Sequence, residues 1–198
     1  MPRVSQRDKY VVQIFELFKK EGLNLNMEQI AVSLGLTKKT LYNNFESKEN
    51  LINSVFDYYY SSLDSKIKSS MALSSNAIED LLVVGKTIGE EINALGETVL
   101  TDFAQYRFIY HKSRVSFYDI IIRENLAKGI SEGLYRKNVN IEYAVLFYNA
   151  IVDFYYTWNG KFNFFEQTAE YFDELVIQHL YSVVNTQGRE LLDNYVSR

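Results

Sequence analysis

The chain contains one proline, Pro2, among its 198 residues. Proline removes a backbone hydrogen-bond donor and breaks helices, so nothing of this kind interrupts a long helix beyond position 2. Glycines separate the periodic stretches instead, and these are Gly22, Gly35, Gly96, Gly133, Gly160 and Gly188. No alternation of apolar and polar residues persists for long enough to indicate a strand. The sequence therefore predicts an all-α fold.

Residues 26–48 predict two short helices joined by a tight turn. Asn26 is suited to cap the first helix, because its side-chain oxygen can accept a free backbone N–H. Gly35 follows the last apolar position, where a residue in the left-handed conformation commonly ends a helix. In the second helix, Leu41 and Phe45 are four residues apart and would face inward. This arrangement is typical of a helix-turn-helix.

The outer face of the second short helix has side chains that suit DNA. Lysines in its first turn oppose the helix dipole, which indicates another purpose such as binding phosphate. Amides can hydrogen-bond a base edge, adenine above all, and a tyrosine can contact a phosphate or a thymine methyl. A lysine directly after a capping serine would place an ammonium at a helix amino terminus. The candidate DNA-contacting residues are Asn26, Lys38, Lys39, Thr40, Tyr42, Asn43, Asn44 and Lys48.

The run IAVSLGLTKKTLYNNFESKENL resembles the DNA-binding signature of the TetR family of transcriptional regulators. The matching features are Ile30-Ala31, Gly35, Thr37, Thr40-Leu41-Tyr42, Phe45, Ser47-Lys48 and Leu51. Met27 and Glu28 depart from the pattern, since many relatives have small polar or basic groups there. The resemblance implies a helix-turn-helix DNA-binding domain over residues 1–47 and a helical effector-binding and dimerisation domain over residues 48–198.

Charge is distributed unevenly along the chain, whose formal net charge is −4. Residues 1–50 hold eight Lys/Arg and six Asp/Glu, whereas the remainder holds thirteen and nineteen. A weakly basic tip on an acidic body suits a local contact with DNA. The tip is only weakly basic, so we expect affinity to need two tips or to rest on few phosphate contacts.

The chain has no cysteine, which excludes disulfides, thiolate metal sites and cysteine nucleophiles and fits a reducing cytosol. No apolar run approaches the roughly 20 residues of a membrane span, and the amino terminus lacks the apolar centre of a secretory signal. We therefore expect a cytoplasmic protein with no membrane partner.

The last two long helices, expected over residues 140–158 and 164–184, are apolar on more than one side. On the first, one stripe contains Ala144, Tyr148, Ile151, Tyr155 and Trp158, and another contains Phe147, Ala150 and Phe154. The last helix shows the same excess, with Phe165, Phe172, Leu175, Val176, Leu180, Val183 and Val184. A helix that is apolar on two sides must be buried on both. We therefore predict a homodimer in which two helices from each subunit form a four-helix interface, as the resemblance also implies.

Aromatic residues crowd the body and give the only indication of a ligand. They could line a pocket for a flat or apolar compound, although aromatics at helical spacing also build ordinary cores. The candidate effector-binding residues are Tyr59, Phe103, Tyr106, Tyr110, Phe117, Tyr155 and Trp158. Gly85 and Gly89 either permit close helix packing or leave room for a ligand. The resemblance implies that the fourth helix, from Lys48 to about Ser69, carries the effector signal to the tip.

These features predict a ligand-responsive repressor that binds a palindromic operator as a homodimer and is released by a small hydrophobic or aromatic effector. The alternative is a dimerising protein-interaction module, similar to an antirepressor, without its own DNA target; Glu28 and the weak basic charge favour it. We expect no enzyme, metal or cofactor. His111 and His179, the two histidines, are far apart in sequence, and there is no glycine-rich phosphate loop.

Overall fold

The computed structural model describes residues 5–96, 99, 100, 102, 106, 117–159 and 168–197, with side chains left out at 117, 156–159 and 168–170. Its helices are α1 (Gln6–Glu21), α2 (Met27–Ser33), α3 (Lys38–Phe45), α4 (Lys48–Met71), α5 (Ala77–Asn93), α7 (Phe117–Ser131), α8 (Ile141–Asn159), α9 (Thr168–Val183) and α10 (Thr186–Val196). Within these residues the only β-type pairing is an isolated bridge between Tyr135 and Val184. The prediction of an all-α fold is confirmed.

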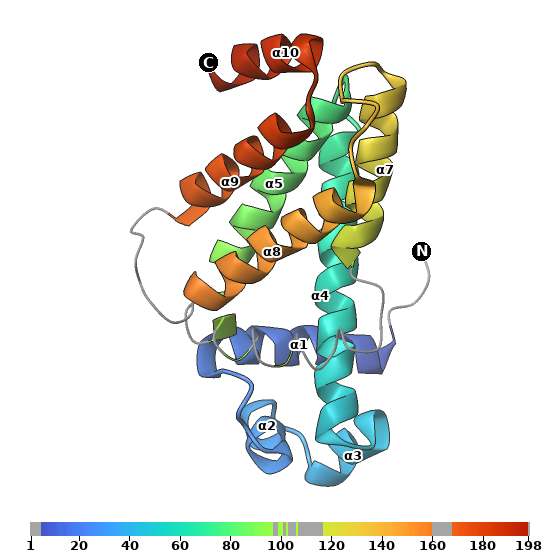
Figure 1. Cartoon of the computed structure of the whole chain (residues 1–198). Coiled ribbons are helices and arrows are strands. Elements are labelled where there is room, and N and C mark those ends of the chain that lie inside the picture. Colours follow the sequence, from blue (N-terminus) through green and yellow to red (C-terminus); the bar gives the residue numbers. More distant parts are fainter. Residues whose placement is uncertain are drawn as a thin grey trace.

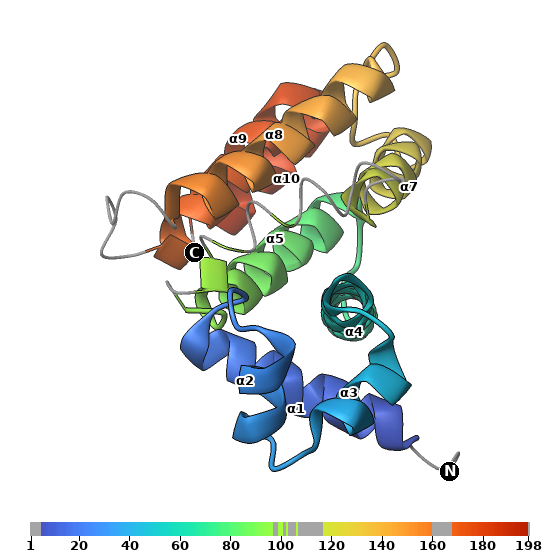
Figure 2. The same cartoon turned by 90° about the horizontal axis from the view of Figure 1, so that it is seen from below.

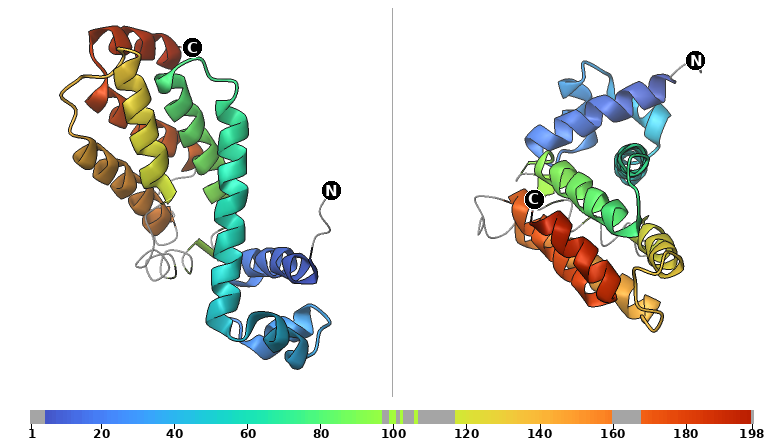
Figure 3. Two further views of the ribbon diagram at one scale, coloured as in Figure 1. Left: turned by 90° about the vertical axis from the view of Figure 1, so that its right-hand side faces the viewer. Right: turned by 90° about the horizontal axis from the view of Figure 1, so that it is seen from above.

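The three amino-terminal helices form a small unit at one end of the long helix α4 (Figures 1 and 3). Ile14 and Phe18 of α1 are fully buried, as are Ile30 of α2 and Leu41 of α3. Phe45 is 2% exposed and completes this core with the first turns of α4. The inward face predicted for the second short helix is confirmed.

Side-chain caps explain why these short helices begin where they do. Ser5 and Asn26 each form a capping box, Asn26 with Gln29 three residues later. Thr37 accepts a hydrogen bond from the backbone N–H of Thr40 and so caps α3. Gly35, with a φ of +66°, makes the left-handed turn between α2 and α3.

Helix α4 runs from the amino-terminal unit to the far end of the body, as Figure 3 shows on the left. Ser47 caps it by accepting a hydrogen bond from the backbone N–H of Asn50. Leu51 and Val55 are buried in the amino-terminal half, and Leu63 and Ile67 are buried in the other half. One continuous helix therefore contributes to the core of both the amino-terminal unit and the body, and the role of this helix in carrying an effector signal stays a prediction.

Helix α5 lies in the middle of the body, between α4 and the pair α8 and α9 (Figure 2). A Cβ at Gly85 would lie 2.8 Å from Cγ2 of Val176, and one at Gly89 would lie 3.5 Å from the ring of Phe172. The two glycines thus allow close packing of α5 against α9, and they leave no room for a ligand between these helices.

The far end of the body is closed by α10 and by the turn between α7 and α8. Gly133 has a φ of +72° and ends the α7 segment in the left-handed conformation. Asn140 accepts a hydrogen bond from the backbone N–H of Tyr143, so it caps α8. Asn76 caps α5 by accepting hydrogen bonds from the backbone N–H groups of Ile78 and Glu79.

His179 of α9 is fully buried against aromatic rings of α8. Its ring centroid lies 5.8 Å from that of Phe147 and 5.3 Å from that of Tyr148. Neither ring nitrogen of His179 has a hydrogen-bond partner, and the hydroxyl of Tyr148 lacks one too. Burial lowers the pKa of His179 to about 4 from its ordinary 6.5.

This shift predicts an acid-sensitive fold. Below pH 6.5 the unfolded chain binds a proton at His179, whereas the folded chain does so only near pH 4. The free energy of unfolding should therefore fall by about 3 kcal/mol as the pH drops across that window, and remain unaffected by His179 above it. Urea unfolding at fixed protein concentration between pH 8 and about 4 measures this profile.

His179→Leu is the matched variant, because it keeps the volume and removes the titrating group. The difference between the two stability profiles should be flat above pH 6.5 and should change steadily as the pH falls from 6.5 to about 4. Parallel profiles for wild type and variant would contradict a buried neutral histidine.

Candidate nucleic-acid interface and effector region

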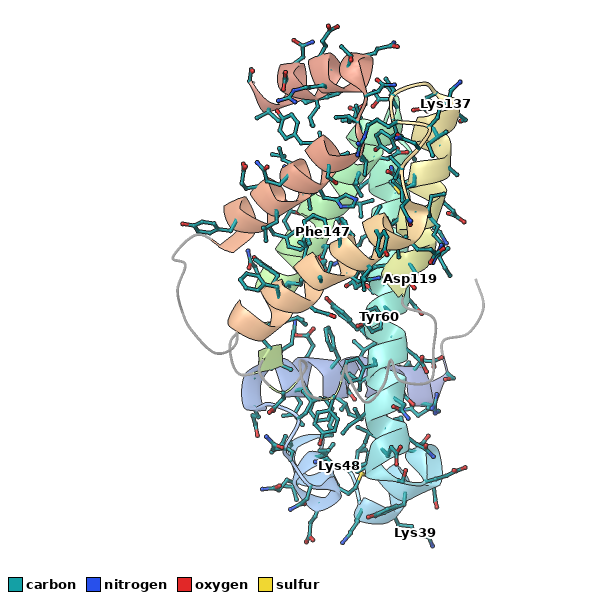
Figure 4. All side chains as sticks on the ribbon, viewed as in Figure 1. Lys39, Lys48, Tyr60, Asp119, Lys137 and Phe147 are labelled. Carbon is teal, nitrogen blue, oxygen red and sulfur yellow. The ribbon has the colours of Figure 1, made fainter. Side chains whose placement is uncertain are left out.

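The outer face of α3 presents four of the predicted DNA contacts to solvent. Lys38, Lys39 and Asn43 are exposed, and the side chain of Tyr42 is 41% exposed. Lys39 and Asn43 lie on the side of the helix opposite the buried Leu41, Tyr42 lies beside them, and Lys38 lies closer to Leu41 in the first turn. Figure 4 shows Lys39 at the tip of the molecule, at the end farthest from α10. A cation, an aromatic hydroxyl and an amide on one exposed helix face match the chemistry of phosphates and base edges.

Three further predicted contacts use their side chains within the domain. Oδ1 of Asn26 accepts backbone hydrogen bonds of 3.0 Å from both Glu28 and Gln29. The hydroxyl of Thr40 lies 2.8 Å from that of Thr37. The amide of Asn44 donates to the carbonyl of Thr40 at 2.8 Å. These side chains stabilise the start of α2 and the helix α3. A contact with DNA would have to form while these intramolecular hydrogen bonds are kept.

Lys48, the eighth predicted contact, is half-buried at the start of α4 (Figure 4). Burial lowers the pKa of its ammonium, and the nearby carboxylate of Asp102 partly opposes that shift. Lys48 therefore lies between the amino-terminal unit and a carboxylate of the body.

Glu28, which departs from the family pattern, pairs with a lysine of the outer face. Its Oε2 lies 3.7 Å from Nζ of Lys38, and both side chains are more than half exposed. This ion pair links α2 to α3 and neutralises one of the two lysines at the amino end of α3. Lys39 is left as the more available cation there.

Arg7 holds the three-helix unit together. Its Nε donates to the carbonyl of Asn44 at 3.2 Å, and its Nη2 donates to the hydroxyl of Ser54 at 2.6 Å. Its guanidinium also lies 5.2 Å from the centre of the Phe45 ring. Arg7 therefore joins α1, α3 and α4.

Asp102 is a residue that sequence reasoning missed. One carboxylate oxygen accepts the backbone N–H of Leu23 at 2.8 Å, and the other accepts the side-chain amide of Asn24 at 3.0 Å. These residues form the loop between α1 and α2, so Asp102 ties the body to the amino-terminal unit at a second place besides α4. No local sequence pattern could have revealed it, because the partners are 78 and 79 residues away.

The junction between α3 and α4 has a strained backbone. Glu46 has a φ of 62°, and it is the single non-glycine residue with a positive φ among those described. Side chains rarely adopt this conformation because Cβ approaches a carbonyl oxygen. The strain lies between the outer face of α3 and the start of the long helix.

Three of the seven predicted effector residues have described side chains. Tyr59 and Tyr155 are buried, the hydroxyl of Tyr155 donates to Asn93 at 3.1 Å, and Tyr106 is half-buried. Phe103 and Tyr110 lie outside the described residues, as do the side chains of Phe117 and Trp158. A groove of about 520 Å³ opens elsewhere, between α4, α5 and α7, and it is lined mainly by aliphatic and charged residues.

Helix α8 exposes an apolar stripe on the side away from its own core. Its exposed members are Tyr143, Leu146, Phe147, Ala150 and Phe154. Figure 4 shows Phe147 where α8 and α9 lie side by side. Of the apolar residues predicted on the last long helix, Leu175 is half-buried and Phe165 lies outside the described residues. The others are buried in the subunit's own core, and these are Phe172, Val176, Leu180, Val183 and Val184.

Among the described residues, no group of three or more acidic or histidine side chains could hold a metal ion. Nor does any helix in that part of the chain have the length and apolarity needed to cross a membrane.

Comparison with known proteins matches residues 12–55 to the family described as bacterial regulatory proteins, tetR family. No curated protein matches the chain. Among solved structures, a ketosteroid transcriptional regulator, KstR2 of Mycobacterium tuberculosis, is similar over 92% of this chain and 97% of that one, with a TM-score of 0.64 and 20% identity. A fatty acid degradation regulator, FadR from Bacillus halodurans, covers 89% of this chain and 96% of its own at a TM-score of 0.73 and 18% identity.

A TetR transcription regulator from Haloarcula marismortui is also similar, with a TM-score of 0.74 and 14% identity over 91% of this chain and 98% of that one. At such identities these likenesses establish the fold.

Proposed function

Because the chain carries the amino-terminal domain of the tetR family of bacterial regulatory proteins, we propose that it is a transcriptional repressor in the cytoplasm that binds a palindromic operator as a homodimer. The exposed Lys39, Tyr42 and Asn43 on the outer face of α3, opposite the buried Leu41, carry this proposal. We retain residues 1–47 as the DNA-binding domain and residues 48–198 as the effector-binding and dimerisation domain.

Each exposed residue of α3 has a distinct proposed role. Lys39 binds a phosphate, and Tyr42 contacts a phosphate through its hydroxyl or a thymine methyl through its ring. Asn43 reads a base edge in the major groove. Lys38 joins the phosphate contacts when it leaves Glu28, and the partly buried Lys48 supports the same backbone from the start of α4.

The exposed stripe of α8 supports the homodimer. Its apolar side chains form a continuous surface, and exposed apolar patches of this kind commonly mark protein interfaces. Two-fold symmetry would bring the stripe of each subunit against its twin and place the two α3 helices on one face of DNA. A small effector with an apolar or aromatic part, bound in the body, releases the operator by changing the separation of the two tips.

DNA binding predicts a selectable operator. Selection from random duplexes with the purified protein should yield a palindrome with half-sites about 34 Å apart. Lys39→Ala should weaken binding to all sequences alike. It should also lower the slope of log affinity against log salt concentration by the equivalent of about two phosphate contacts per dimer. Asn43→Ala should instead change the base preference. Binding isotherms at several salt concentrations measure both effects.

Lys20→Ala is the control, because Lys20 is an exposed lysine in the last turn of α1, at the end toward the body. It should leave the isotherms unchanged. A folded dimer that retains no duplex at low salt would refute the repressor and favour the protein-interaction module.

The dimer predicts that one charge in the α8 stripe separates the subunits. Ala150 is exposed between Phe147 and Phe154, so Ala150→Glu places a carboxylate opposite its symmetry mate without disturbing the subunit's core. Analytical ultracentrifugation should show a monomer or a dimer weakened at least about tenfold. Ala127→Glu, the same change at an exposed site on α7, should leave the wild-type assembly intact; equal behaviour of the two variants would place the interface elsewhere.

Glu28 predicts a gain of affinity on substitution. Glu28→Gln releases Lys38 and removes a carboxylate near the duplex, so affinity for DNA should rise roughly three- to tenfold at moderate salt, with a steeper salt dependence. Glu16→Gln is the matched control, because it breaks the comparable surface pair with Lys19 on α1. An affinity no higher than that of the control would show that Glu28 lies away from the phosphates.

A further inference from the structure

The groove between α4, α5 and α7 has the size and the lining of a ligand site. Its volume of about 520 Å³ lies within the roughly 300–1,000 Å³ that is usual for small-molecule sites. Ile67 and Met71 of α4 and Ile120 and Ile121 of α7 supply apolar surface. Ile120 is 53% exposed, although it is a large aliphatic side chain. The groove therefore offers apolar surface that a ligand would cover.

Both lysines of the groove are already committed to carboxylates. Nζ of Lys68 lies 2.7 Å from Asp64, and Nζ of Lys128 lies 2.6 Å from the buried Asp80. The hydrogen bond with Asp80 raises the pKa of Lys128. Each ammonium already has a carboxylate partner, so the positive charge of both lysines is largely balanced within the groove.

Glu124 is the carboxylate of the groove that remains without a partner. It is exposed on α7, one turn from Ile120 and from Lys128, and no ion pair or hydrogen bond engages it among the described residues. Lys128 also lies 3.8 Å from Glu132, which adds a further negative charge beside the groove. The groove consequently has an excess of negative charge next to an aliphatic surface.

We propose that this groove binds an amphipathic organic cation, with its apolar part against Ile67, Met71 and Ile120 and its charged nitrogen at Glu124. A cation gains from the unpaired carboxylate, whereas a carboxylate ligand would meet three acidic side chains and two lysines that are already paired. This assigns the effector proposed above to a chemical class and to a place different from the predicted aromatic cluster.

The position of the groove supplies a route to the DNA-binding face. Helix α4 packs on α1, α3 and α5, whereas α7 packs on α5 and α8. A ligand in the groove touches α4 and α7 together, so it favours one inclination of α4 relative to the body (Figure 3). Because α4 begins at Lys48, directly after α3, that inclination sets the place of the recognition face. This regulatory step rests on the proposed function, and the binding step does not.

Calorimetric titration of the full chain tests the binding step with three probes that share a phenylbutyl body: phenylbutyltrimethylammonium, phenylbutanol and phenylbutanoate. The ammonium should bind about three- to fivefold more tightly than the alcohol, and the carboxylate should bind most weakly. Glu124→Gln should reduce the ammonium to the affinity of the alcohol. Ile120→Arg, at an exposed position, should abolish binding of the ammonium.

Glu190→Gln, which removes an exposed carboxylate from α10, is the control and should leave all three affinities unchanged. Equal affinity for ammonium and alcohol, tighter binding of the carboxylate, or ammonium binding that survives both groove variants would overturn the proposal. The selected operator is then titrated with and without the ammonium. A protein that binds the operator but not the ammonium would overturn the proposed groove site and support the repressor. A protein that binds the ammonium but retains no duplex would support the groove site and overturn the repressor.

Discussion

Burial of α4 along its whole length is the constraint on which the rest of the structure depends. Leu51 and Val55 pack with α1, α2 and α3, Leu63 and Ile67 pack in the body, and all four belong to one continuous core. The position of α3 and the packing of the body are therefore set by the same helix. Asp102 adds a second tie, because it holds the loop between α1 and α2 from the side of the body.

Local chemistry made the amino-terminal unit predictable. The signals are capping side chains, a left-handed glycine and apolar residues four apart, and all of them lie within a few residues of one another. Asn26 caps α2 and Gly35 makes the left-handed turn. Leu41 and Phe45 are buried as their spacing predicts. The contacts that sequence did not reveal are long-range. Asp102 meets a loop far away in the chain, and Arg7 reaches Ser54 across three helices.

The same distinction applies to the candidate sites. Periodicity identified the outward face of α3, but it could not show that Asn44 would donate to Thr40 or that Lys38 would pair with Glu28. It also assigned an excess apolar face to α9, whose side chains α5 and α8 in fact bury, because periodicity gives the apolar faces of a helix and not the number of neighbours. The groove beside Glu124 was invisible in sequence, since it exists only where α4 and α7 diverge over α5.

The close approach of α5 and α9 limits where the molecule can bend. With 2.8 Å between a would-be Cβ of Gly85 and Val176, these two helices have no slack and shift as one block. If α4 tilts as proposed, the movement cannot be absorbed between α5 and α9. It would then appear where α4 slides over α5, and the α5–α9 block would serve as the fixed support for the long helix.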